Sequence, residues 1–249
     1  MSSSDGCKTM ETKNILGVDA GGTFTDFVLI KYEESISMRA LKVLSTPDAP
    51  EKAVLQGIKK LGLESTLKTG DLEIIHGSTV ATNAVLENKL SKTALVTNRG
   101  FKDLLTIGRQ TRPALYQLEY EPIIPPVPRD LCFETGGRLG ADGSEIEALS
   151  QVELEDLVNE VMSQEPESVA INLLFSFINP EFEIIIERAL LKRMPSVRVS
   201  RSSTVLPVYK EFERGIATWL NAALEPLISR YLVSLRDSLG NPKLQIMQS

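Results

Sequence analysis

The stretch NILGVDAGGTFTDFVLI, residues 14–30, limits the possible folds more than any other part of the chain. Apolar residues flank the loop DAGGTFTD on both sides, which predicts two strands, 14–19 and 26–32, around a tight turn. Gly21 and Gly22 permit the sharp backbone path that this turn needs. The loop leads into a strand rather than a helix, and it matches neither G-x-G-x-x-G nor the P-loop pattern. The sequence therefore points away from both of those nucleotide-binding folds.

Two carboxylates bracket this loop. Asp19 stands at the end of the first apolar strand, where an unpaired carboxylate is costly to bury. Carboxylates in such positions commonly bind Mg²⁺, directly or through water. We therefore predict that Asp19 is a magnesium ligand and a catalytic residue. Asp26, at the start of the second strand, is expected to close the turn or to orient a water molecule.

The residues between the carboxylates suit an anion. The backbone N–H groups of Gly21, Gly22, Thr23 and Phe24 can form a nest for phosphate oxygens. The hydroxyl groups of Thr23 and Thr25 add further donors. A hairpin that holds phosphate between two strands is typical of the actin/hexokinase/Hsp70-like ATPases. The alternative is a glycine hairpin in which an Asp side chain caps the turn.

Composition narrows the class of protein. The 249 residues carry 27 Lys and Arg against 33 Asp and Glu, a net charge of −6, which argues against a nucleic-acid partner. No apolar run reaches the roughly 18 residues of a membrane span. Residues 1–13 lack the apolar core of a signal peptide and are expected to be a disordered leader. We expect a cytoplasmic protein, free thiols at Cys7 and Cys132, and no zinc site, because the chain has one His and two Cys.

Residues 14–108 are predicted to form an α/β lobe with a mixed sheet. Helical spacing over 51–62 ends at Gly62, and Ser78 or Thr79 is expected to cap a helix that begins the segment STVATNAVLENK. The predicted strands of this lobe are 14–19, 26–32, 38–45, LEIIHGS and 92–98.

Residues 109–240 are predicted to contain a proline-rich excursion and an inserted α/β subdomain. The excursion covers 109–145, and regular order resumes with a helix capped by Ser150. SVAINLLFSF and SVRVSRSS are predicted strands, and NPEFEIIIERALLKRM is a predicted helix. A long helical pattern follows, which we expect Pro226 to kink or divide and Gly240 to end.

Residues 241–249 are predicted to begin another strand. Leu244, Ile246 and Met247 have the apolar character of a buried strand, and the sequence stops there. We therefore expect the chain to be a fragment of a longer protein, and its nucleotide site to be about half complete. The alternative is an edge strand that closes the sheet.

Several segments together resemble one family. GVDAGGTFTDFVL, HGSTVATNAVLE, TALVTNRGFKDLLTIGRQTRPALY, EFERG and LQIMQS occur in the order found in the N-terminal half of the hydantoinase A/5-oxoprolinase/acetone carboxylase β-subunit family. The resemblance runs from about residue 14 to the last residue. It implies a two-lobed, actin-like (ribonuclease H-like) ATPase fold of which the second lobe is missing from this chain.

The resemblance also implies site residues. Asp19, Gly21, Gly22, Thr23, Thr25 and Asp26 match the first phosphate motif of the family. The segment HGST-x-x-TN, which faces the cleft in this family, is matched by His76, Gly77, Thr79, Thr82 and Asn83. From this match we expect Thr79 and Asn83 to bind substrate and His76 to act in catalysis or substrate binding. A hydrogen-bonded structural role for His76 is the alternative.

Five further positions are less specific. Arg109 and Arg112 in GRQTRP are expected to pair with a substrate carboxylate or phosphate, with solvated loop arginines as the alternative. Glu213 and Arg214 match a family segment but can equally form a pair on a helix surface. Phe175 stands where many relatives carry His, so that this member is expected to differ in specificity if that His serves substrate or a metal.

The resemblance implies a Mg²⁺- and ATP-dependent hydrolase of cyclic amides or imides, in which phosphorylation of the carbonyl oxygen activates the substrate. A separate hydantoinase B-type subunit or a fused domain is the implied partner, and this chain alone is expected to be inactive. A β-like subunit of an ATP-dependent ketone carboxylase is the second hypothesis. A truncated, non-catalytic binding or assembly module is the third.

Overall fold

The computed structural model describes residues 13–33, 35–46, 49–111, 126–240 and 242–247. The chain divides into two compact units, which we treat separately. Unit 1 comprises residues 1–89 and 228–249, and unit 2 comprises residues 90–227. None of the helices in the described parts of the chain is long and apolar enough to cross a membrane.

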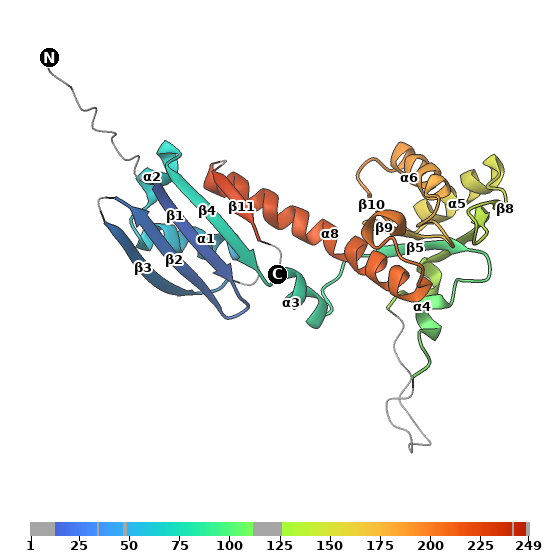
Figure 1. The fold of residues 1–249 in the computed structure, drawn as a ribbon, viewed down its shortest axis with the longest axis horizontal. Helices are drawn as coiled ribbons and strands as arrows, with labels where there is room; N and C mark the ends of the chain where they lie inside the picture. The colour runs from blue at the N-terminus through green and yellow to red at the C-terminus, as the bar shows by residue number, and fades with distance from the viewer. Residues whose placement is uncertain (1–12, 34, 47–48, 112–125, 241, 248–249) are drawn as a thin grey trace, which may run out of the picture. The chain divides into compact units, whose positions relative to one another are not determined.

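Unit 1 is built on a five-stranded sheet in the order β11-β4-β1-β2-β3 (Figure 1). The first three strands form the predicted antiparallel meander, and β4 and β11 run parallel to β1 and to β4 respectively. The predicted mixed sheet is therefore confirmed. The strands are β1 Lys13–Ala20, β2 Phe24–Tyr32, β3 Ile36–Leu44, β4 Leu72–Ser78 and β11 Lys243–Ile246.

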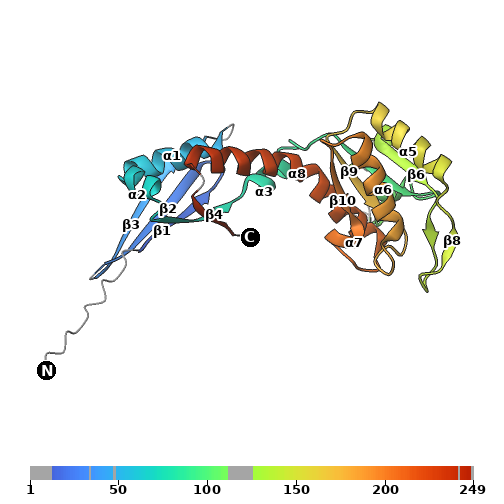
Figure 2. The ribbon, with the colours of Figure 1, turned by 90° about the horizontal axis from the view of Figure 1, so that it is seen from above.

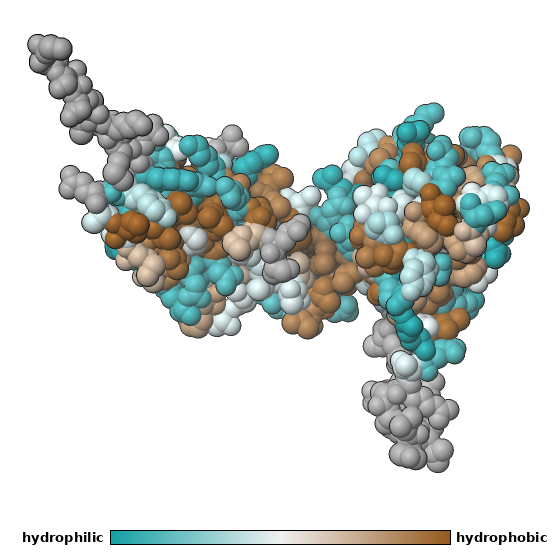
Figure 3. All heavy atoms as spheres, in the orientation of Figure 1, coloured by the Kyte–Doolittle hydropathy of each residue, from teal (hydrophilic) through white to brown (hydrophobic). Residues whose placement is uncertain are grey.

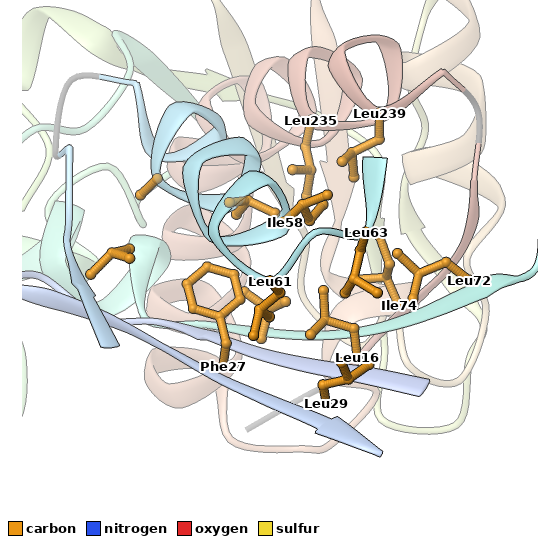
Figure 4. Packing of buried hydrophobic residues seen from close by; sticks show 14 of the residues in the cluster. Leu16, Phe27, Leu29, Ile58, Leu61, Leu63, Leu72, Ile74, Leu235 and Leu239 are labelled. Atoms are coloured by element: carbon orange, nitrogen blue, oxygen red, sulfur yellow. The ribbon is translucent and has the colours of Figure 1, made fainter. Parts of the chain in front are cut away.

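Three helical segments cover one face of this sheet. Helices α1 (Pro50–Lys60) and α2 (Glu64–Thr69) lie on the same side of the strands, as Figure 2 shows. Residues 228–239 of helix α8 (Glu211–Leu239) complete the layer. The core between sheet and helices is apolar (Figure 4), and its fully buried side chains include Leu16, Phe27, Leu29, Ile58, Ile74 and Leu235.

The opposite face of the unit 1 sheet is open among the described residues. Ile36 and Met38 on β3 are each 71% exposed, and Val28 on β2 is 40% exposed. Figure 3 shows hydrophobic surface over the strands that face the reader in Figure 1. Apolar side chains are therefore found on both faces of this sheet, but helices cover only one of them.

Unit 2 contains a second, all-parallel sheet in the order β10-β9-β5-β6. Helices α5 and α6 pack through one apolar cluster, and residues 212–223 of α8 contribute to another. The main elements are β5 Thr93–Asn98, β6 Cys132–Thr135, β9 Ser168–Asn172, β10 Arg198–Arg201, α5 Gln151–Ser163 and α6 Glu181–Arg193. The short elements are α3 Val80–Leu86, α4 Leu104–Ile107, η1 Arg129–Leu131, β7 Arg138–Leu139, β8 Glu145–Glu147 and α7 Ser202–Val205; all except α3 lie in unit 2.

The boundary between the two units differs from the predicted boundary between lobe and subdomain. Strand β5 was expected in the first lobe, but it pairs with β6 and β9 of unit 2. All six of its residues are buried, so both of its faces need cover, which the sheet of unit 2 provides. The predicted excursion over 109–145 also contains β6, which lies at the edge of this sheet. Apolar pattern identifies a strand but does not identify its sheet.

The structure confirms the predicted cap of α5 but not a break in the last helix at Pro226. Ser150 caps α5 in the predicted way, because its hydroxyl accepts the N–H of Glu153 while the Glu153 carboxylate accepts the N–H of Ser150. Pro226 was expected to kink or divide the last helix, and it does not divide it, because α8 is one helix of 29 residues with Pro226 inside it. Buried side chains on both sides of the proline, such as Ala223 and Leu235, anchor the helix in apolar clusters and offset the missing N–H.

The last strand differs from its prediction in burial. We expected 244–247 to begin a buried strand, but Ile246 is 46% exposed and Met247 is 61% exposed. Strand β11 lies at the edge of the sheet and pairs with β4 alone among the described strands. Its exposed side chains are therefore those of an edge strand within the described residues.

Candidate functional site

The β1–β2 hairpin forms the centre of the candidate site. Residues 21–23 connect the strands, and the N–H of Gly21 donates to the carbonyl of Phe24 at 3.1 Å. A Cβ atom on Gly21 would lie 2.8 Å from that carbonyl oxygen, so the loop requires glycine there. Gly22 and Thr23 are exposed, and within the described residues their N–H groups donate to no protein acceptor. These two amides are thus available to an anion.

Ser45 holds this loop in place. Its N–H donates to the carbonyl of Thr23 at 2.9 Å, and its hydroxyl donates to the carbonyl of Gly21 at 2.7 Å. The Ser45 and Thr25 hydroxyl groups are also 2.9 Å apart. Sequence reasoning missed Ser45, although a three-stranded meander places the end of its third strand beside the first turn. It also expected Thr25 to bind phosphate, whereas Thr25 is 1% exposed and its hydroxyl is bonded to Ser45.

Asp19 and Asp26 lie directly opposite each other on β1 and β2. Both belong to the open face of the sheet, because their neighbours Val18 and Phe27 point into the core. Lys42 on β3 forms a salt bridge with Asp26 at 3.1 Å. Asp19 is exposed and has no salt-bridge partner in the described chain. One acidic side chain at this loop is therefore paired, and the other is available.

The β4–α3 corner lies against the same loop. The parallel register places Gly77 opposite Asp19. The N–H and the hydroxyl of Thr79 both donate to the carbonyl of Ala20, at 3.2 Å each. Asn83 in α3 donates from Nδ2 to the Thr79 hydroxyl at 3.4 Å, and the same Nδ2 would lie 3.1 Å from a Cβ on Gly22. The structure thus brings together the two motifs that sequence analysis singled out separately.

The predicted cap of α3 is made differently from either expectation. Thr79 occupies the N-cap position, but its side chain makes no capping bond. The Ser78 hydroxyl instead accepts the N–H of Val80 at 3.2 Å. Thr79 is therefore exposed at the corner with its hydroxyl directed at the β1 strand end.

His76 lies on the other side of the sheet from Asp19. Its side chain is 0% exposed, and Nε2 is hydrogen-bonded to the hydroxyl of Tyr231 in α8. Within the described residues, Nδ1 makes no hydrogen bond of ordinary geometry. The expectation that the imidazole faces a cleft therefore differs from the structure, because alternation along β4 turns Gly77, not His76, toward the open face. The geometry is that of the alternative, a hydrogen-bonded buried histidine.

A groove of about 600 Å³ runs over the open face beside the hairpin. Polar side chains line one part of the groove and apolar side chains of the strands line the rest. Its lining includes Asp19, Asp26, Thr79, Val28, Ile75 and Met247. The groove therefore places the Asp19 carboxylate and the exposed Thr79 next to an apolar strand surface.

The candidate site suits Mg²⁺ bound by one protein carboxylate together with water and phosphate oxygens. No group of three or more His, Cys, Asp or Glu side chains in the described ranges is arranged to hold a metal ion. Mg²⁺ often uses one or two carboxylates together with water and phosphate oxygens. The exposed Asp19 beside two donor amides matches that mode, whereas a cage made entirely of protein ligands does not.

The remaining predicted residues belong to unit 2. Arg109 forms an ion pair with Glu213, and this guanidinium holds the pKa of the Glu213 carboxyl below its ordinary value. Arg214 is not on the helix surface, since it is 0% exposed and its Nε donates to Oδ1 of Asn172 at 3.0 Å. Phe175 adopts φ 57°, a left-handed conformation in the turn after β9. Arg112 lies outside the described residues.

The single histidine supplies a test of this geometry. Burial lowers the pKa of His76 below its ordinary value of 6.5, although Asp19 and the Val18 carbonyl act in the opposite direction. Unfolding restores the ordinary value, so this residue contributes stability above about pH 6.5 that is lost as the pH falls toward the folded-state pKa. We expect the ¹⁵N imidazole signal to titrate with a midpoint below 6.5. A midpoint at or above 6.5 would contradict the buried position, and a histidine peptide with blocked termini in the same buffer is the control.

Comparison with known proteins identifies the family of the chain. A family model described as the hydantoinase/oxoprolinase N-terminal region matches residues 15–194, which include both motifs. The chain belongs to this family. An uncharacterised protein of Methanocaldococcus jannaschii is 37% identical over 94% of the chain, and the caprolactamase subunit alpha of Pseudomonas jessenii is 33% identical over 87%. A 5-oxoprolinase of Arabidopsis thaliana is 31% identical over 93%.

Two solved structures share the fold of this chain. The ATP-dependent caprolactamase from Pseudomonas jessenii superposes with a TM-score of 0.80 over 93% of the chain at 29% identity. A nucleotide-free acetone carboxylase gives a TM-score of 0.78 over 95% at 24% identity. The chain spans 35% of the archaeal relative, 32% of the caprolactamase subunit and 21% of the plant oxoprolinase.

Proposed function

We propose that this chain is the N-terminal region of a cytoplasmic, ATP-dependent hydrolase of cyclic amides or imides, and that its β1–β2 hairpin binds the phosphates of Mg·ATP. The observation that carries the proposal is the exposed Asp19 beside the Gly22 and Thr23 amides, which donate to no protein acceptor in the described chain. The β4–α3 corner contacts the start of this loop, because the Thr79 hydroxyl donates to the carbonyl of Ala20. In this proposal unit 1 is a lobe of the actin/hexokinase/Hsp70 type, and unit 2 is an inserted subdomain.

The chemistry follows from the weakness of an amide as an electrophile. Transfer of the γ-phosphoryl group to the amide oxygen forms a P–O bond and releases ADP. Water then attacks the activated carbon and the ring C–N bond breaks, which leaves the nitrogen as a protonated amine and the carbon as an acyl phosphate. A second water molecule hydrolyses the acyl phosphate to a carboxylate and phosphate. The protein must align the phosphoryl group with the substrate oxygen and offset its negative charge. Mg²⁺, when bound at Asp19, supplies positive charge beside the phosphate oxygens.

Support for an amide substrate comes from the relatives. Those above 30% identity include a caprolactamase subunit and a 5-oxoprolinase, both named for cyclic amides. The acetone carboxylase is a more distant likeness, and we keep ATP-dependent ketone carboxylation as the second candidate function because of its fold similarity. We also propose that the active enzyme contains polypeptide beyond this chain, namely a second ATPase lobe and a hydantoinase B-type partner or fused domain.

The test begins with the native protein purified from its source cell together with whatever copurifies. Initial rates of ADP formation are measured with Mg·ATP and, in turn, hydantoin, 5-oxoproline, caprolactam, or acetone with bicarbonate. We expect ADP release to depend on one of the cyclic amides and to match ring opening in stoichiometry. Dependence on acetone and bicarbonate alone would select the carboxylase. Absence of any substrate-dependent ADP release would overturn the proposal and favour a binding or assembly module.

A further inference from the structure

A buried polar chain lies beneath the β4–α3 corner. The Tyr231 hydroxyl is hydrogen-bonded to Nε2 of His76. Two residues further along, the Ser78 hydroxyl accepts the N–H of Val80, the first residue of α3. One phenol group on α8 therefore fixes the end of β4 immediately before the residues that lead into α3.

Burial makes the hydrogen bond between His76 and Tyr231 costly to break. His76 is 0% exposed and Tyr231 is 7% exposed, so water does not replace a lost partner. An imidazole and a phenol that separate in such a place both leave polar atoms unsatisfied. Burial also raises the pKa of Tyr231 to about 12, which keeps the hydroxyl protonated and able to donate. The conformation in which the two rings meet is thus strongly favoured.

The position of His76 affects the hairpin loop through the residues of the β4–α3 corner. His76 immediately precedes Gly77, which lies opposite Asp19 in the parallel register. Two residues further on, Thr79 donates twice to the carbonyl of Ala20, where the hairpin loop begins. A shift of His76 along or out of β4 would therefore move the contacts that support the loop.

We propose that Tyr231 is a positioning residue for the phosphate site, which holds the Gly77–Thr79 corner against the hairpin loop through His76. Tyr231 does not touch the ligand. The inference rests on the proposed function for the identity of that ligand, Mg·ATP. It gives His76 an indirect role in place of direct contact with substrate.

The experiment compares Tyr231→Phe with the unmodified protein in the native complex. The variant keeps the ring and removes only the hydroxyl. Loss of one buried hydrogen bond should raise amide hydrogen exchange over residues 77–83 about tenfold and raise the KM for ATP by a similar factor, with kcat changed less than about twofold. The matched control is Leu235→Ala, one turn further along the same face of α8 and buried in the same core. It should lower Tm while leaving exchange over 77–83 in proportion to the rest of unit 1.

Three results would overturn the inference. These are unchanged exchange over 77–83 in Tyr231→Phe, an equal local effect in Leu235→Ala, or faster exchange without a change in the KM for ATP. Failure of the proposed function looks different. In that case the unmodified protein shows no ATP turnover at all, and the exchange data alone decide whether Tyr231 fixes the corner.

Discussion

Replacement of Asp19 by Asn should lower ATP-dependent ring opening by about 100-fold or more, the scale seen when one group that stabilises developing charge is removed. Asp19 is exposed, has no salt-bridge partner in the described chain and lies beside the two amides that donate to no protein acceptor. Asn keeps the size of the side chain but removes the negative charge that holds Mg²⁺. The rate is measured with the native complex at saturating substrate and varied Mg²⁺.

The control for Asp19→Asn is Asp71→Asn, an exposed carboxylate in the turn before β4. This variant loses the same charge from the same unit but lies at the opposite end of β4 from the corner. It should keep activity within about twofold, as surface changes away from special features usually do. Full activity in Asp19→Asn, at every Mg²⁺ concentration, would show that the hairpin carboxylate does not serve the nucleotide.

Replacement of Arg214 by Met should destabilise unit 2 by about 3 kcal/mol, because it leaves buried acceptors without donors. The guanidinium is 0% exposed and donates to Oδ1 of Asn172 and the carbonyl of Val208 at 3.0 Å each, and to the carbonyl of Leu173 at 2.6 Å. It also lies 5.3 Å from the ring centroid of Phe177. Met retains the apolar length of the side chain but supplies no hydrogen bond.

Unfolding of unit 2 can be followed without a label. Trp219 is the sole tryptophan of the chain and is 8% exposed within this unit, so urea denaturation monitored by its fluorescence reports on unit 2. The matched control is Arg193→Met, since Arg193 is exposed and its one hydrogen bond within the described residues is to Asn159 at 3.3 Å. It should change the free energy of unfolding by less than about 0.5 kcal/mol. A loss below about 1 kcal/mol in Arg214→Met would contradict the structural role.

Local patterns predicted the parts of the fold that neighbouring residues determine. The meander of β1, β2 and β3 follows from alternation around a glycine turn, and the capping box at Ser150 follows from a Ser and a Glu three residues apart. These elements need no knowledge of distant contacts. The same holds for the loop of the candidate site, because its two glycines and two carboxylates are contiguous.

Long-range contacts account for what the sequence did not reveal. Tyr231 meets His76 across 155 positions of the chain, and only the path of α8 brings them together. Ser45 lies 24 residues from Gly21 and resembles any serine at a strand end. Arg214 looks like a surface residue, because burial of a guanidinium requires acceptors from another segment, here the turn after β9. None of these roles has a local signature.

The open face of the unit 1 sheet also affects the tendency of the chain to self-associate in solution. Ile36 and Met38 lie on β3, which is an edge strand with one unpaired side among the described strands. An apolar surface next to free backbone donors and acceptors favours edge-to-edge and face-to-face self-association. The net charge of −6 opposes this only while it is unscreened. Low ionic strength and dilute handling are therefore the conditions that keep this chain dispersed, and high salt favours its precipitation.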